Sequence, residues 1–256
     1  MQISLNTADI EEVRSATDLG VLRKVTTNPS HMAKAGVRDP RRHIQEICHV
    51  ADVPISAEVT TTTTGEMLDE ARDIATWSPN VVVKLPTTPD GLRAVNTFSK
   101  QTHTAECTGC PWRDGCPIRD RFGPGLTRKV PVNATVVFSV GQAVAASSAG
   151  AAYVSPFVGR LDAVGQDGMR LLADIAEIFQ RHDVPTRIIA AALRNPIHVT
   201  ESFRAGAHLC TVSYAVLDQL LHHPLTDAAV EGFTADWAAL QASLARPSDA
   251  SARSAV

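Results

Sequence analysis

The stretch Val81-Val82-Val83-Lys84-Leu85-Pro86 places a single lysine inside a short run of β-branched residues. Such a run, preceded by Asn80 and ended by a proline, predicts a strand that is buried on both faces, as the strands of parallel sheets are. Burial disfavours the charged form of a lysine, and an uncharged amine is a nucleophile toward carbonyl groups. The alternative is a lysine at the end of a strand whose ammonium group reaches solvent.

Short apolar runs alternate with longer helical patterns on both sides of this stretch. Strands are expected at residues 2–5, 21–26, 55–60, 81–86, 130–138, 152–155, 187–192 and 208–212, and helices at 8–16, 41–51, 65–77, 89–100, 141–148, 168–181, 196–204 and 214–221. Eight strand–helix units with mostly short connections predict a (β/α)8 TIM barrel, as one domain over residues 1–245. An open, doubly wound sheet is the competing architecture.

The positions of the polar residues favour the barrel. In a barrel, functional side chains gather where many strands end, and no dinucleotide-binding or phosphate-loop glycine motif follows any strand here. Polar residues at or near the carboxyl ends of the expected strands are Asn6, Thr26, Asn28, Glu58, Lys84, Asn133, Thr135, Ser155, Arg194 and Ser213.

The overall charge and the apolar pattern exclude several classes of partner. The chain of 256 residues has a formal net charge of -3, which does not favour binding to nucleic acid or to an anionic membrane. The N-terminal residues lack a basic segment followed by an apolar one, and no run reaches the roughly 18 apolar residues of a membrane span. We therefore expect a cytoplasmic protein.

Seven segments, in this order, carry a resemblance to a known family. They are LNTADI (5–10), VTTNPS (25–30), ISAEV (55–59), VVKLP (82–86), VNAT (132–135), SPFVGRLD (155–162) and ALRN (192–195). The chain from residue 2 to about 240 resembles the transaldolase and fructose-6-phosphate aldolase family, in its short, aldolase-like branch. The resemblance implies an enzyme that forms a Schiff base between Lys84 and a ketose or ketone, with no metal in the chemistry.

The resemblance also assigns roles to residues. It implies that Glu58 and Thr135 hold the water that shuttles protons, and that Asn28 and Asn133 bind donor hydroxyls. Two alternatives stay open: Glu58 could be a carboxylate bound to an arginine, and Thr26 and Asn28 could only shape the turn. The remaining expected substrate-binding residues are Thr26, Ser155, Phe157, Arg160 and Arg194, of which the two arginines would bind a phosphate.

Asn6 departs from the family pattern, which has an aspartate acting as general acid/base at this position. An amide cannot take up a proton in this way, and loss of a positioned base typically costs about 10²- to 10⁴-fold in rate. Another group could serve as the base, the reaction could be a different iminium or enamine step, or the barrel could be non-catalytic. Lys24, two residues before Thr26, is a possible compensating group, but it could also only pack inside the barrel.

An insertion at residues 101–129 is the second departure, because the family pattern has a short link between helix and strand here. The insertion is rich in cysteine. His103, Cys107, Cys110 and Cys116 have the composition of a closed Cys3His zinc site. An iron–sulfur cluster is the alternative metal group, and free or disulfide-bonded thiols are the alternative to any metal. Loops between a helix and the next strand emerge opposite the active site of a barrel, so we expect a structural role for this segment.

The C-terminal part shows a helical pattern beyond Trp237 and a segment at 246–256 whose composition predicts disorder. In the short branch of the family this tail packs over a neighbouring subunit, so the resemblance implies a homo-oligomer. The predicted function is a transaldolase-like aldolase acting on a sugar or sugar phosphate. The alternative is a non-catalytic barrel whose metal-bound insertion serves as an interaction module.

Overall fold

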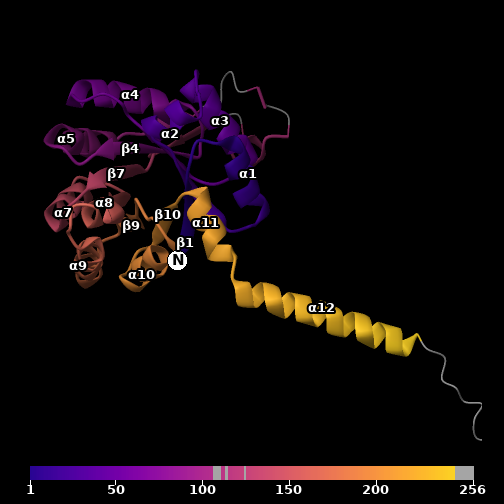
Figure 1. Cartoon of the computed structure of the whole chain (residues 1–256). Helices are drawn as coiled ribbons and strands as arrows, with labels where there is room; N and C mark the ends of the chain where they lie inside the picture. The colour runs from indigo at the N-terminus through magenta and orange to yellow at the C-terminus, as the bar shows by residue number, and fades with distance from the viewer. Residues whose placement is uncertain (106–110, 113–114, 124, 246–256) are drawn as a thin grey trace, which may run out of the picture. The chain divides into compact units, whose positions relative to one another are not determined.

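The computed structural model describes residues 1–105, 111–112, 115–123 and 125–245. Eight parallel strands form a closed barrel in the order β1-β10-β9-β8-β7-β4-β3-β2, which confirms the predicted (β/α)8 fold (Figure 1). These strands are β1 (Gln2–Asn6), β2 (Leu22–Thr26), β3 (Ile55–Glu58), β4 (Val81–Pro86), β7 (Val132–Val137), β8 (Tyr153–Pro156), β9 (Arg187–Ala190) and β10 (Leu209–Val212).

A helix follows each barrel strand, and its apolar residues are buried as the amphipathic patterns predict. The eight expected helices are α1 (Ile10–Asp18), α3 (Pro40–Val50), α4 (Thr64–Thr76), α5 (Pro89–Phe98), α7 (Val140–Ser148), α9 (Gly168–Arg181), α10 (Pro196–Arg204) and α11 (Tyr214–Leu221). Figure 1 shows α4, α5, α7 and α9 outside the strands. The core therefore lies between this layer and the barrel wall.

The register of the strands brings three polar side chains together inside the barrel. Lys84 in β4 lies opposite Glu58 in β3 on one side and opposite Asn133 in β7 on the other. Since successive side chains of a strand point to opposite faces, residues in register across parallel strands point the same way. The three valines before Lys84 are buried, and the lysine is the one charged residue of β4.

Two short helices that the sequence did not predict lie in the loops after β2 and β8. They are α2 (Pro29–Lys34) and α8 (Val158–Asp162). Asn28 is the N-cap of α2, and its side-chain oxygen accepts a hydrogen bond from the backbone N–H of His31 at 2.9 Å. A proline at the first helical position favours this start, since its missing N–H is not needed there.

The described parts of the segment at residues 101–129 contact the amino ends of the strands. Strands β5 (His103–Ala105) and β6 (Leu126–Arg128) pair as an antiparallel hairpin, and α6 (Pro117–Phe122) lies between them in the chain. Arg128 donates a hydrogen bond to the carbonyl of Val81 at 2.8 Å, and Arg121 forms an ion pair with Asp52 at 2.9 Å. Val81 begins β4, so these contacts place the hairpin opposite the carboxyl ends, as predicted.

The chain divides into two compact units, Met1–Leu217 and Asp218–Val256. The second unit contains α12 (Pro224–Leu244), which begins well before the predicted helical pattern at Trp237. His223 caps it by accepting a hydrogen bond from the N–H of Leu225. Residues 246–256, predicted to be disordered, lie outside the described residues. Among the residues described, no helix is both long enough and apolar enough to cross a membrane.

Candidate active site

Lys84 lies inside the barrel with its side chain only 4% exposed. Its Nζ donates a hydrogen bond to Oε2 of Glu58 at 2.8 Å. The alternative of a lysine that extends into solvent is therefore wrong. The alternative for Glu58, a carboxylate bound to an arginine, is also not what the structure shows, since the partner of Glu58 is Lys84.

The contact with Glu58 changes one detail of the sequence interpretation, which expected burial to keep the amine uncharged. A carboxylate at 2.8 Å stabilises an ammonium group, and it also stands where it can accept a proton from that group. The pair can thus pass from ammonium and carboxylate to free amine and carboxylic acid. Glu58 is 15% exposed, so it lies on the side of Lys84 that is nearer to solvent.

A chain of hydrogen bonds holds Asn133 beside the lysine. Ser155 donates to Oδ1 of Asn133 at 2.8 Å, and Nδ2 of Asn133 donates to the hydroxyl of Ser56 at 3.3 Å. All three residues are buried. The amide of Asn133 therefore has a fixed orientation, which is what a group that positions a ligand hydroxyl needs.

The hydroxyl of Thr135 is buried and has no hydrogen-bond partner among the described residues. Burying a hydroxyl without a partner is costly, so such an atom is a natural binding point for a water molecule or a ligand. The next residue, Val136, has a φ of 60°. A β-branched residue in this region costs on the order of 1–3 kcal/mol, and such strain clusters at functional sites.

Thr26 and Asn28 lie at the end of β2 and in the turn that follows. The hydroxyl of Thr26 is 3.1 Å from that of Ser4, and Oδ1 of Asn28 caps α2. Asn28 thus helps to shape the turn, as one alternative expected, whereas the Thr26 hydroxyl contacts the neighbouring strand β1. The Nδ2 group of Asn28 forms no hydrogen bond with the described residues, so it can still donate one to a ligand.

The two arginines predicted to bind phosphate come from neighbouring loops. Arg160 is in α8 and Arg194 follows β9, and both are exposed. A methyl group in place of the hydrogen at Gly159 would lie 3.2 Å from Nε of Arg194, so the Arg194 side chain lies against α8. Phe157, the N-cap residue of α8, packs edge-on against Phe138 with ring centroids 5.8 Å apart. The structure therefore brings this predicted set to one part of the rim.

Asn6, at the end of β1, lines a cavity of about 140 Å³. The cavity is also lined by Ser213, by His31 and Lys34 of α2, by Glu12 of α1 and by Asp9, the N-cap residue of α1. Sequence reasoning missed His31 because no helix was predicted after the Thr-Asn-Pro turn. The signal that could have found it is its position three residues after Asn28, in the first turn that a capping asparagine starts.

Lys24 is the second lysine inside the barrel, and it is 1% exposed. Its Nζ has no hydrogen-bond partner among the described residues and lies 4.7 Å from the centre of the Tyr153 ring. Burial, together with the nearby positive charges of Arg187 and Lys84, lowers the pKa of Lys24 to about 7. The structure thus supports the interpretation that Lys24 packs inside the barrel.

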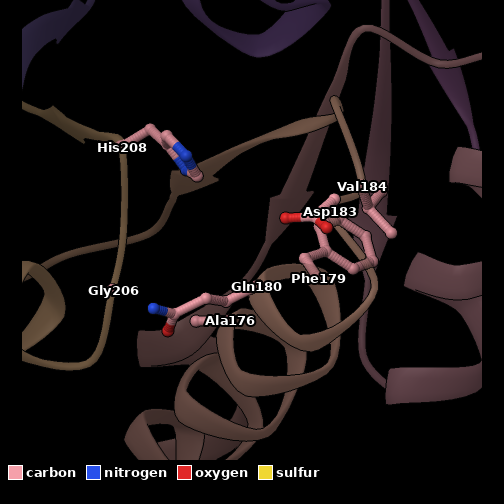
Figure 2. Close-up of a pocket in the computed structure, with 7 residues that line it drawn as sticks. All are labelled: Ala176, Phe179, Gln180, Asp183, Val184, Gly206 and His208. Carbon is pink, nitrogen blue, oxygen red and sulfur yellow. The ribbon is translucent and has the colours of Figure 1, made fainter.

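A larger cavity, of about 440 Å³, lies away from these residues (Figure 2). Gly206 and His208 stand on one side of it, and Phe179, Gln180 and Asp183 stand on the other. These residues precede β10 and β9, so the cavity opens near the amino ends of the strands. It contains none of the predicted site residues.

Two of the four predicted metal ligands lie among the described residues. The His103 ring stacks on Phe98 with centroids 4.2 Å apart, and its Nε2 is buried with no hydrogen-bond partner in the described part of the chain. Cys116 is a buried free thiol at the start of α6. Cys107 and Cys110 lie outside the described residues, and within those residues no three potential ligands cluster as a metal site. The metal site stays a prediction.

Comparisons with known proteins agree with this geometry. The family model described as Transaldolase/Fructose-6-phosphate aldolase matches residues 3–250. A probable transaldolase of Brevibacillus brevis is 45% identical and is aligned over 94% of this chain and 100% of its own length. A probable transaldolase of Roseiflexus castenholzii is 44% identical, with 94% and 99% covered.

Among solved structures, a mandelate oxidase mutant with an FMN adduct superposes with a TM-score of 0.51 at 14% identity, covering 83% of this chain and 64% of its own. This similarity supports the fold only. The relatives lend no support to the alternative of a non-catalytic interaction module. The match over nearly the whole length, with the buried lysine in the fourth barrel strand, shows an enzyme of the aldolase/transaldolase type that belongs to the transaldolase/fructose-6-phosphate aldolase family.

Proposed function

We propose that this enzyme makes or breaks a carbon–carbon bond in a ketose or ketose phosphate through a Schiff base on Lys84. The observation that carries the proposal is the contact between a buried lysine and a carboxylate, 2.8 Å apart, beside a threonine hydroxyl without a partner among the described residues. An iminium ion at Lys84 would act as the electron sink for cleavage of the bond one carbon further along the substrate.

The first steps need proton transfers that Glu58 and Thr135 can serve. Glu58 accepts a proton from the Lys84 ammonium group, and the free amine attacks the carbonyl carbon. The resulting carbinolamine must lose its hydroxyl group as water, for which the protonated Glu58 supplies the proton. The Thr135 hydroxyl, buried and free to bond, would hold that water in place.

The rim of the site supports a phosphorylated substrate. Arg160 and Arg194 come from adjacent loops, and a guanidinium group matches the geometry of a phosphate. Ser155 and Asn133 lie deeper, and their fixed hydrogen bonds favour contacts with the hydroxyl groups of a sugar. The relatives are named probable transaldolases, which agrees with sugar phosphates as substrates.

We also propose that the protein is a homo-oligomer. Helix α12 is exposed along its whole length, although it carries several large apolar side chains. These are Leu225, Val230, Phe233, Trp237, Leu240 and Leu244. An apolar surface of this kind is typical of a protein–protein contact, and a second copy of the chain is the partner that the family resemblance implies. The cytoplasmic location and the zinc or iron–sulfur site in the insertion remain predictions.

Borohydride trapping tests the proposed chemistry. The protein is incubated with a panel of ketoses and ketose phosphates, fructose 6-phosphate among them, and sodium borohydride is added to reduce any imine. We expect mass spectrometry to show the reduced adduct on Lys84 in the wild type and no adduct in Lys84→Met.

Lys100→Met is the matched control, because Lys100 is an exposed lysine outside the barrel interior. This variant should be trapped as the wild type is. Absence of an adduct on Lys84 with every sugar of the panel would refute the proposed function.

A further inference from the structure

The proposed reaction needs a base that Asn6 cannot provide. Cleavage of the carbon–carbon bond requires the loss of a proton from a hydroxyl group. This hydroxyl group is on the carbon of the broken bond that becomes the aldehyde. Asn6 lies at the end of β1, at the position where the family resemblance implies an acid/base group, but a neutral amide does not accept protons in the pH range of enzymes. The structure therefore should contain another basic group close to Asn6.

His31 lies in the same small cavity as Asn6. The cavity of about 140 Å³ is lined by Asn6 and Ser213 from the ends of β1 and β10, and by His31 from α2. The position of His31 is fixed from within the site, since the side chain of Asn28 accepts the hydrogen bond from the His31 backbone N–H at 2.9 Å. The residue thus stands on the same rim as the predicted donor-binding groups.

The imidazole ring of His31 is available for a ligand. It forms no hydrogen bond or ion pair with any residue that the structure describes, and the residue is only partly exposed. By contrast, the ring of His43 on α3 is already engaged, with its Nε2 at 2.6 Å from the carbonyl oxygen of Ala8. Of these two histidines near α1, His31 is the one whose ring nitrogens are both unbonded to the described part of the chain.

The charges around His31 keep its ring neutral. Partial burial lowers the pKa of His31 below the usual histidine value of 6.5, and the positive charges of Lys84 and Lys34 lower it further. Glu12 acts in the opposite direction, and Asp9 is the other acidic residue that lines the cavity. At neutral pH the ring is therefore mainly the free base, which is the form that accepts a proton.

We propose that His31 is the general acid/base of the carbon–carbon step, in place of the carboxylate that Asn6 lacks. The inference rests on the proposed Schiff-base function of Lys84. In cleavage, a ring nitrogen of His31 takes the proton of the hydroxyl group and the oxygen forms the C=O bond of an aldehyde. The electron pair of the broken carbon–carbon bond forms the C=C bond of an enamine, as the π electrons of the iminium move to its nitrogen. In synthesis the protonated ring returns the proton to the new alkoxide.

His31→Gln tests the inference, because glutamine keeps a polar side chain but cannot act as a base at this pH. The substrate is the ketose phosphate that gives the most trapped adduct with the wild type. We expect the rate of aldehyde release to fall by about 10²- to 10⁴-fold, while borohydride still traps the Lys84 adduct to the wild-type extent. An equal aldehyde rate in His31→Gln would overturn the inference and leave the proposed function intact.

The wild-type enzyme keeps the test decisive if His31→Gln does not fold. The kcat/KM of the wild type should decrease as the pH is lowered to values below 6.5, because His31 becomes protonated there. A kcat/KM that does not decrease in this range overturns the inference. Where His31→Gln does fold, adding Asn6→Asp to it should raise its rate of aldehyde release at least tenfold.

His182→Gln is the matched control, since His182 is an exposed histidine at the end of α9. Its aldehyde rate should stay within about twofold of the wild type. A wild type that forms the Lys84 adduct but neither cleaves nor makes a carbon–carbon bond with any sugar would also overturn the role of His31. A wild type that forms no adduct refutes the proposed function itself.

Discussion

Lys84 and Lys24 are both buried lysines on barrel strands, yet their surroundings are opposite. Lys84 lies 2.8 Å from the carboxylate of Glu58. Lys24 has no hydrogen-bond partner among the described residues, and its Nζ lies over the ring of Tyr153. The positive charges of Arg187 and Lys84 are near it. The comparison shows that burial alone does not distinguish the proposed nucleophile from the other lysine. What separates them is a neighbouring carboxylate that can receive a proton.

The difference is largest for adduct formation. Replacing Lys84 by methionine should reduce formation of the trapped adduct by about 10⁴-fold or more, because no other amine meets the carbonyl group. Lys24→Met should still form the adduct at Lys84. Mass spectrometry of borohydride-treated variants measures both results. An adduct that persists in Lys84→Met and disappears in Lys24→Met would exchange the roles of the two lysines.

The partner of Lys84 should matter next. Glu58→Gln removes the group that accepts the lysine proton, so the rate of adduct formation should fall by about 10²- to 10⁴-fold. Trapping at short times after mixing measures this rate. Glu177→Gln, which removes a carboxylate from an exposed pair with Arg181, is the control and should leave the rate unchanged. A Glu58→Gln variant as fast as the wild type would show that the contact is only structural.

Lys24 should instead affect stability. Its pKa of about 7 in the folded chain lies below the ordinary value of 10.5, so only the unfolded chain binds this proton between pH 7 and 10.5. The free energy of unfolding therefore rises with pH in this window and loses that contribution as pH falls through 7. Between pH 6 and 8.5 the rise from Lys24 is about 2 kcal/mol.

Urea unfolding at pH 6 and 8.5 measures this rise. Lys24→Met should lack the contribution of about 2 kcal/mol and should be more stable than the wild type at pH 6. Lys100→Met serves as the control and should keep the wild-type difference. If Lys24→Met shows the same difference between the two pH values as the wild type, the buried amine is not the group that titrates.

The ring beneath Lys24 should have the smallest effect. Tyr153→Leu removes the aromatic face that stabilises the charged amine, a contact worth about 1–2 kcal/mol when desolvated. The stability difference between pH 6 and 8.5 should then grow by about 1 kcal/mol, because the charged form becomes more costly. Tyr153→Phe keeps the ring and should keep the wild-type difference. A larger change in the phenylalanine variant would assign the effect to the hydroxyl group.

The barrel and much of its site could be predicted from the sequence, since both depend on local patterns. The β-branched run around Lys84 is buried as predicted, and Glu58 and Asn133 are its neighbours because parallel strands bring their carboxyl ends together. The ion pair could not be predicted, since side-chain contacts across strands depend on register. The cavity that joins His31 to Asn6 depends on α2, a helix of six residues whose pattern is too short to recognise.

The remaining differences have similar physical causes. Helix α12 begins at Pro224, whereas the sequence predicted a helical pattern only beyond Trp237. The first part of the helix was missed because its apolar residues do not form the one-sided pattern of a helix packed on its own core. The sequence of residues 101–129 identifies four possible metal ligands by residue type. It does not say whether their side chains meet at one point in space. Arg160 and Arg194 were predicted from the family segments. The structure adds that the side chain of Arg194 lies against Gly159, the residue before Arg160.

The pairing of His103 with Arg128 makes the two ends of the insertion neighbours on adjacent strands of one hairpin. The Cα atoms of such paired residues are about 5 Å apart. The chain therefore enters and leaves this segment at nearly the same point, as it does at a tight turn. Segments of other lengths could be exchanged there without altering the spacing of α5 and β7. The amino face of the barrel is thus a position at which evolution, or protein engineering, can add a new module independently of catalysis.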